Sequence, residues 1–141
     1  MSFLLDTNVI SEWIKPKPDQ NVISWLAEVD EDRVFISVIA FAEVRQGVEL
    51  LAVGRRRERL ADWLAEELPE RFHGRILVID QHIAETWGVM MARGQQAGQT
   101  LGSMDAFVAA TAEAHGLTLV TGNVKDFERL GISLLDPWAS R

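Results

Sequence analysis

The sequence predicts an α/β fold of three layers, in which helices cover both faces of a mostly parallel, twisted, five-stranded sheet. Two observations support this prediction. Short apolar runs alternate along the chain with helical patterns, and this alternation is typical of parallel sheets. Each run is continuously apolar, as expected for strands that are covered on both faces.

Five runs are the candidate strands, and the last of them is the weakest. They span residues 3–5, 34–37, 76–79, 117–121 and 132–135. The carboxyl ends of parallel strands lie at one edge of a sheet, and open α/β sheets bind their ligands outside that edge. The residues that follow the strands are therefore the candidates for a functional site.

Capping and turn residues predict where the helices begin and end. Four candidate N-caps precede helical patterns: Asp19, Ser37, Asp80 and Ser103. A short first helix is expected to end before Pro16, and a helix that carries Leu60 and Trp63 is expected to run to Pro69. Gly116 suits the C-cap of the helix that Ser103 begins.

Length and composition predict one globular domain over residues 1–141. Cysteine is absent, which excludes disulfides and thiolate zinc sites. No basic leader precedes the first apolar run, and no stretch approaches the ~18 apolar residues of a membrane span. We therefore expect a soluble, cytoplasmic protein with no membrane partner.

The net charge of −7, taken alone, argues against a nucleic-acid partner. Basic residues nevertheless cluster in one region of the sequence. They are Arg55, Arg56, Arg57 and Arg59, with Arg45 upstream and Arg71 and Arg75 downstream. The cluster fits a solvated helix start or a surface for nucleic-acid phosphates, and the sequence leaves both interpretations open.

Acidic and amide side chains follow the expected strands or lie in the neighbouring helices. They are Asp6, Glu43, Asp105, Asn123 and Asp126. Asp105 lies near the start of a helix that is small or apolar nearly all round, and Glu43 lies mid-helix among apolar residues. A lone carboxylate in a dry site destabilises the fold unless something compensates its charge.

Carboxylates that lie close together repel one another. A bound cation would offset this repulsion and best explains why several acids occur at these positions. Ligation by oxygen alone selects a hard ion such as Mg²⁺ or Mn²⁺. His73, His82 and His115 fall at a turn and at helix ends, and we interpret them as structural. A carboxylate-held ion at the mouth of a sheet suits phosphoryl chemistry. No phosphate-binding glycine loop indicates a nucleotide cofactor.

Four segments, in this order and spacing, resemble a known family. The segments LLDTNVISEW, AFAEVRQG, GSMDAFVAATAEAHG and LVTGNVKDF make the chain similar to bacterial PIN-domain proteins of the VapC type. The proline-rich segment after the first helix and the C-terminal LLDPW resemble the FitB-like branch. The similarity covers essentially the whole chain and implies a PIN-domain-like fold.

The resemblance implies a Mg²⁺- or Mn²⁺-dependent endoribonuclease that cleaves structured RNA, often tRNA, through a metal-activated water. Asp6, Glu43 and Asp105 match the three acids that form the metal site in the family. Under this implication Asp6 and Asp105 ligate the metal, whereas Glu43 ligates it or acts as the general base. The fourth catalytic position is Asn123, with Asp126 three residues on as an alternative ligand.

Neighbouring residues receive supporting roles from the same resemblance. Thr7 or Asn8 would orient Asp6, and both would cap the next helix. Gly122 stands where many relatives have Arg, which removes one candidate phosphate contact.

The resemblance also implies partners. The chain would be the toxin of a type II toxin–antitoxin pair, and a DNA-binding antitoxin would place an Arg or Lys in its acidic pocket. The Arg55–Arg59 cluster would contact the RNA backbone. Helices that carry Trp25, Trp63 and Trp87 would contribute to a homodimer interface.

Two other interpretations stay open at this point. One is a different metal-dependent phosphoryl hydrolase; a haloacid-dehalogenase-like phosphatase, however, needs a second Asp where Asn8 stands, and a receiver domain needs a pair of acids before Asp80. The other is a PIN-like scaffold that binds RNA or an antitoxin without cutting, which Asn123 in place of an acid allows.

Overall fold

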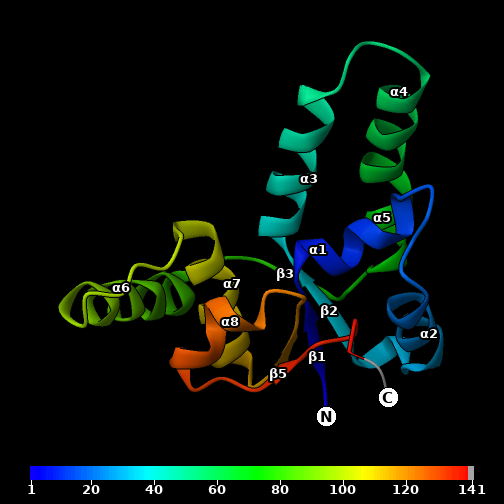
Figure 1. The fold of residues 1–141 in the computed structure, drawn as a ribbon. Helices are drawn as coiled ribbons and strands as arrows, with labels where there is room; N and C mark the ends of the chain where they lie inside the picture. The colour runs from blue at the N-terminus through cyan, green and yellow to red at the C-terminus, as the bar shows by residue number, and fades with distance from the viewer. Residues whose placement is uncertain (140–141) are drawn as a thin grey trace.

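The computed structural model describes residues 1–139. The strands in this part of the chain form one five-stranded sheet (Figure 1). The strand order is β3-β2-β1-β4-β5, and every strand pair is parallel. The strands are β1 (Phe3–Leu5), β2 (Val34–Ser37), β3 (Ile76–Leu77), β4 (Thr118–Val120) and β5 (Leu134–Leu135). The predicted α/β fold is confirmed, although the last three strands are shorter than expected.

The strand order reverses at β1. The chain winds from β1 through β2 to β3 on one side, and then crosses to β4 and β5 on the other. In open α/β sheets, ligands bind at such a switch point because the connections on its two sides diverge there. The carboxyl ends of β1 and β4 therefore border the crevice where a site is expected.

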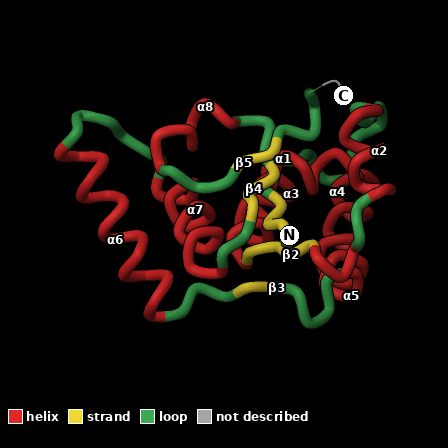
Figure 2. Tube along the Cα trace, turned by 90° about the horizontal axis from the view of Figure 1, so that it is seen from below, coloured by secondary structure: helices red, strands yellow, loops and turns green. Residues whose placement is uncertain are grey.

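Helices flank both faces of the sheet (Figure 2). One side carries α1 (Thr7–Ile10), α2 (Gln20–Glu28), α4 (Arg55–Asp62) and α5 (Leu68–Arg71), and the other carries α6 (Gln81–Gln96), α7 (Ser103–His115) and α8 (Val124–Phe127). The short helical turns are η1 (Ser11–Ile14), η2 (Glu31–Arg33), η3 (Trp63–Glu67) and η4 (Glu128–Leu130). Within residues 1–139, no helix is long and apolar enough to cross a membrane.

Helix α3 (Val38–Leu50) contributes to both sides of the sheet and forms a hairpin with α4. The hairpin rises beyond the carboxyl edge of the sheet (Figure 1). Its tip exposes two apolar side chains, Leu50 and Val53.

Two apolar cores lie on opposite faces of the sheet. Leu5 and Val120 belong to the core under α1, α2 and α5, whereas Leu4 and Leu119 belong to the core under α6 and α7. This division follows from the strand geometry, because successive side chains of a strand point to opposite faces. The central strands are thus anchored on both faces, which fixes the position of the residues that follow them.

Most of the predicted caps are confirmed. The side chains of Asp19, Ser37 and Asp80 accept hydrogen bonds from backbone N–H groups in the first turns of α2, α3 and α6. Gly116 follows α7 with φ +64°, a left-handed conformation that suits glycine. The prediction that Ser103 is a cap was wrong. Gly102 holds the cap position and has no side chain to accept a bond, so Ser103 is the first helical residue.

The prediction that a helix ends at Pro69 was also wrong. The segment η3 is a wide π-helical turn, in which the N–H of Leu68 donates to the carbonyl of Trp63. Helix α5 then continues from Leu68 through Pro69 to Arg71. Proline lacks an N–H and is tolerated in the first turn of a helix, so a new turn that starts after the π segment accommodates it.

Candidate active site

Asp6 directly follows β1 and lies at the switch point of the sheet. Its backbone N–H donates to the carbonyl of Val120 at 2.9 Å, which ties it to β4. The side chain is only 5% exposed. Its Oδ1 accepts the N–H of Thr7 at 2.9 Å, and its Oδ2 accepts the hydroxyl of Thr121 at 2.8 Å and the amide of Asn8 at 3.3 Å. The carboxylate is therefore fixed from both central strands.

Thr121 and Asn8 connect Asp6 to the segment that follows β4. The hydroxyl of Thr121, which is fully buried, accepts the N–H of Asn123 at 3.0 Å while it donates to Asp6. The side-chain oxygen of Asn8 accepts the N–H of Gly122 at 3.2 Å. Residues 121–123 and the carboxylate of Asp6 thus form one hydrogen-bonded unit.

Glu43 lies in the second turn of α3, above the same edge of the sheet, and is half-buried. The hydroxyl of Thr7 donates to its Oε1 at 2.7 Å. Glu43 also lines a cavity of about 210 Å³ together with Thr7, Ser11 and Gly47. Gly47, where an added Cβ would meet nothing within 4 Å, leaves open space in this cavity.

Asp105 lies in the first turn of α7, a helix whose middle is fully buried. Burial, followed by the charges of Asp6, Glu43 and Asp126, raises the pKa of its carboxyl to about 6. Burial likewise raises the pKa of Asp6, opposed by the hydrogen bonds from Thr121 and Thr7 and reinforced by the charges of Glu43 and Asp126. The charges of acids from the N-cap of α1 and from α3, α7 and α8 therefore act on one site.

Asn123 and Asp126 differ in their relation to that site. Asn123 precedes α8, is exposed, and makes no side-chain cap bond. Asp126 is exposed in α8, and its charge contributes to the raised pKa of both Asp6 and Asp105. Electrostatically, the acid at position 126 is the fourth member of the group.

The acids are not arranged as a ready-made ligand set. In the part of the chain that the structure describes, no three His, Asp or Glu side chains form a group that could hold a metal ion as they stand. The oxygens of Asp6 and Glu43 instead accept bonds from Thr7, Asn8 and Thr121. Because a carboxylate offers about four lone-pair sites, these bonds orient the two acids and leave capacity for a further partner.

The expectation that Thr7 and Asn8 cap the next helix was wrong, whereas Asn8 does donate to Asp6 as expected. Both lie within α1, and Asp6 itself occupies the cap position. The side chain of Thr7 holds Glu43, whereas that of Asn8 holds Asp6 and Gly122. Sequence reasoning missed Thr121 altogether, although a polar residue at the end of an apolar strand beside the switch point was the available signal.

Trp138 covers the segment after β4 from outside. A Cβ placed on Gly122 would lie 2.9 Å from the indole ring, too close for a side chain. The carbonyl of Trp138 accepts the amide of Asn21 at 3.0 Å, and its N–H donates to Asp136 at 2.9 Å. Glycine at position 122 therefore allows the indole to pack directly on the site segment.

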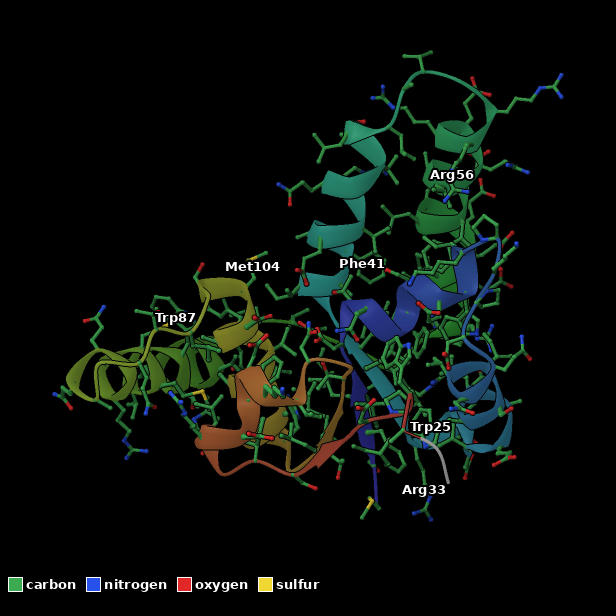
Figure 3. The ribbon with its side chains drawn as sticks, viewed as in Figure 1. Trp25, Arg33, Phe41, Arg56, Trp87 and Met104 are labelled. Carbon is green, nitrogen blue, oxygen red and sulfur yellow. The ribbon has the colours of Figure 1, made fainter. Side chains whose placement is uncertain are left out.

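Some arginines of the basic cluster already have partners within the chain. Arg57 pairs with Glu49 at 2.5 Å, and Arg71 pairs with Glu31 at 2.6 Å and lies over the ring of Trp13. Arg75 donates to three backbone carbonyls. Arg55, Arg56 and Arg59 remain exposed on α4 (Figure 3 labels Arg56).

The three tryptophans expected at a subunit interface differ in exposure. Trp25 is 5% exposed, and its ring packs edge-on against Phe3 within the core of the chain. Trp63 and Trp87 are half-buried, and Trp87 stacks on Phe107. His73 lies in a turn, His82 in the first turn of α6 and His115 at the end of α7, as expected.

Comparison with known proteins is consistent with this geometry. The PIN domain family model matches residues 3–132. Toxin FitB of Neisseria gonorrhoeae is 35% identical over 96% of this chain and 97% of its own length. The VapC ribonuclease Y4jK of Sinorhizobium fredii is 34% identical over 96% of both chains. The tRNA(fMet)-specific endonuclease VapC of Shigella flexneri is 28% identical over 99% of both chains.

Solved structures give the same result. The crystal structure of FitAcB from Neisseria gonorrhoeae matches with a TM-score of 0.91 and 34% identity, over 98% of this chain and 99% of that one. FitAB bound to the IR36 DNA fragment matches with a TM-score of 0.91 and 32% identity, over 99% and 97% of the two chains. The chain belongs to the PIN domain family, among relatives that are FitB and VapC toxins.

Proposed function

We propose that the chain is a metal-dependent endoribonuclease and the toxin of a type II toxin–antitoxin pair, folded as one PIN domain over residues 1–141. The observation that carries the proposal is the group of acids at the switch point of the sheet, where burial and the charges of Glu43 and Asp126 raise the pKa of Asp6 and Asp105. Relatives named as ribonucleases support the reaction class.

The donor set fits a hard divalent cation. The side chains that surround the site offer carboxylate, amide and hydroxyl oxygens, which Mg²⁺ and Mn²⁺ prefer. A positive charge would also relieve the repulsion that raises the pKa of Asp6 and Asp105. Such an ion, when bound, acts as a Lewis acid that polarises the phosphate and lowers the pKa of a water.

The residues then take distinct roles. Asp6 and Asp105 are the proposed metal ligands, and the bonds from Thr7, Asn8 and Thr121 hold Asp6 in position. Glu43, oriented by the hydroxyl of Thr7, either ligates or accepts a proton from the attacking water. Asp126 supplies a fourth negative charge, and Asn123 is the alternative, neutral ligand for that position.

The proposed substrate is structured RNA, with tRNA as the first candidate, because a full-length relative is named as a tRNA(fMet)-specific endonuclease. The proposed partners are a cognate DNA-binding antitoxin and a second copy of the chain. A solved relative complexed with DNA supports the antitoxin partner. The acidic site is a suitable receptor for a basic antitoxin side chain.

Incubation of the pure protein with tRNA and with single-stranded DNA, in Mg²⁺, Mn²⁺ or EDTA, tests the function. We expect metal-dependent scission of RNA that Asp6→Asn and Glu43→Gln each reduce by about 10²-fold or more. Glu113→Gln is the control, since it removes an exposed charge from α7, the helix that carries Asp105. A scaffold that only binds RNA predicts no scission in any metal.

A further inference from the structure

Two cationic side chains next to the acids have no internal partner. Lys125 lies in α8 and Arg129 in η4, one helical turn apart, and both are exposed. Within residues 1–139 neither makes an ion pair or a side-chain hydrogen bond, whereas Arg57, Arg71 and Arg75 all do. The charges of Lys125 and Arg129 are thus free to act on a ligand.

Both cations line the same cavity as two of the acids. The cavity measures about 390 Å³, and Asp105 and Asp126 line it together with Lys125 and Arg129. The connection between α6 and α7 contributes further lining residues, among them Gln99 and Thr100. A cavity of this size, lined by charged and polar side chains that include two of the acids, suits a sugar–phosphate unit better than an apolar ligand.

The α4 arginines face a different space. Arg56 and Arg59 line a cavity of about 600 Å³ with Trp13, Trp63 and Glu67. Neither Asp105 nor Asp126 lines that cavity. Contacts made there would act away from Asp105 and Asp126, whereas Lys125 and Arg129 share a cavity with both of these acids.

We propose that Lys125 and Arg129 bind backbone phosphates of the RNA strand adjacent to the phosphate that is cleaved. The inference rests on the proposed function, because it assigns the substrate strand to this cavity. Lysine and arginine are the side chains that neutralise nucleic-acid phosphates. Many relatives are expected to have an arginine at position 122, where this chain has glycine. Lys125 in α8 and Arg129 in η4 would supply positive charge in its place.

The carboxylates in the same cavity set a condition on binding. Asp105 and Asp126 repel a phosphate while their charges are unbalanced. RNA should therefore bind more tightly in Mg²⁺ than in EDTA, and the contribution of Lys125 and Arg129 should be larger in Mg²⁺.

Fluorescence anisotropy with a labelled mixed-sequence RNA hairpin tests the proposal. Binding is measured in a Glu43→Gln background, so that the hairpin is not consumed, in Mg²⁺ and in EDTA over a salt series. The test variant is Lys125→Gln/Arg129→Gln. We expect its affinity in Mg²⁺ to fall roughly tenfold, and the slope of log affinity against log salt to flatten by about 1 to 2, for two lost phosphate contacts.

Two controls separate a local contact from the net charge. Lys17→Gln/Arg33→Gln makes the same charge change at exposed positions that do not line this cavity. Arg55→Gln/Arg56→Gln/Arg59→Gln tests the rival surface on α4. Equal losses in the Lys17/Arg33 control, or a loss confined to the α4 variant, would overturn the proposal, as would unchanged affinity and slope in the test variant.

The variant Lys125→Arg/Arg129→Lys keeps both positive charges and tests whether weaker binding comes from a disturbed fold and not from the lost charges. It should bind like the parent, and equal melting temperatures of all variants should confirm intact structure. Wild-type protein that cuts no RNA in any metal refutes the proposed function, and binding still reports on the two cations. Wild-type cutting with unaltered binding by the test variant refutes the inference alone.

Discussion

The hydroxyl of Thr121 connects the ends of the two central strands. It donates to Asp6 at 2.8 Å and accepts the N–H of Asn123 at 3.0 Å, in a fully buried position. A buried carboxylate that loses a donor keeps its desolvation penalty without the compensating bond. A single oxygen atom thus helps to hold a candidate metal ligand and the segment that carries Asn123.

Replacing Thr121 by Val, which keeps the shape and removes the hydroxyl, should lower the free energy of unfolding by about 1–3 kcal/mol. Thermal denaturation in EDTA measures this change. Thr111→Val is the matched control, because the buried hydroxyl of Thr111 only donates to the carbonyl of Phe107 in its own helix. If the free energy of unfolding falls equally in the two variants, the hydrogen bond from Thr121 to Asp6 stabilises the fold no more than an ordinary bond within a helix.

Asp105 gives the metal-free protein a pH-dependent stability. Its pKa is raised from 3.8 to about 6, by burial first and by the neighbouring acids second. The folded state therefore binds this proton more tightly than the unfolded state, so the contribution of Asp105 to stability is greatest below about pH 4 and is lost as the pH rises toward 6. Asp6 acts in the same direction.

Asp105→Asn should remove part of the stability that the metal-free protein loses as the pH rises, because asparagine carries no charge at any pH. In EDTA at pH 7 the variant should be more stable than the parent by about 1 kcal/mol, a value already discounted for solvent screening of a half-exposed group. At pH 4 the difference should be small. Denaturant titrations at the two pH values measure it, and an equal difference at both would contradict the assignment.

At the scale of elements, the segment after β4 is held from inside by Asp6 and Asn8 and from outside by Trp138. Gly122 is the point of closest approach, with 2.9 Å from an added Cβ to the indole. The C-terminal segment that carries Trp138 is also tied to α2 through Asn21. Residues far apart in the sequence therefore determine the position of one short connection.

Gly122→Ala should lower the free energy of unfolding by about 1–3 kcal/mol, because the new methyl group displaces the indole. In a Trp138→Ala background the same substitution should cost less than about 0.5 kcal/mol, since nothing remains to be displaced. Gly88→Ala, in the open middle of α6, should instead stabilise by roughly 0.5–1 kcal/mol. Additive effects of Gly122→Ala and Trp138→Ala would reject the contact.

The sequence predicted these elements well where local chemistry decides. The strands around Leu4 and Leu119 are continuously apolar, and Asp19, Ser37 and Asp80 are efficient caps. It failed where tertiary packing decides. The π-helical turn before Pro69 has no signal in the local sequence. The edge strands β3 and β5 are short because only two residues of each pair with the neighbouring strand.

At the scale of the whole molecule, the strand order brings distant acids together. Asp6, Glu43, Asp105 and Asp126 could be named as candidates from the sequence, because the carboxyl edge of a parallel sheet is a general binding position and because acids in apolar helices need a compensating partner. Thr121, Trp138, Lys125 and Arg129 could not, because their importance depends on which strands are neighbours and on how the chain ends pack. The internal partners of Arg57 and Arg71 were hidden for the same reason.

The end groups of the RNA products test the central claim most directly. If a water activated at the acidic site attacks the phosphate, each cut leaves a 5′-phosphate and a 3′-hydroxyl, because the ribose 2′-hydroxyl takes no part. Mass spectrometry of the products formed in Mg²⁺, and absent with Asp6→Asn, identifies them. We predict 5′-phosphate and 3′-hydroxyl ends; 2′,3′-cyclic phosphate ends would contradict the account.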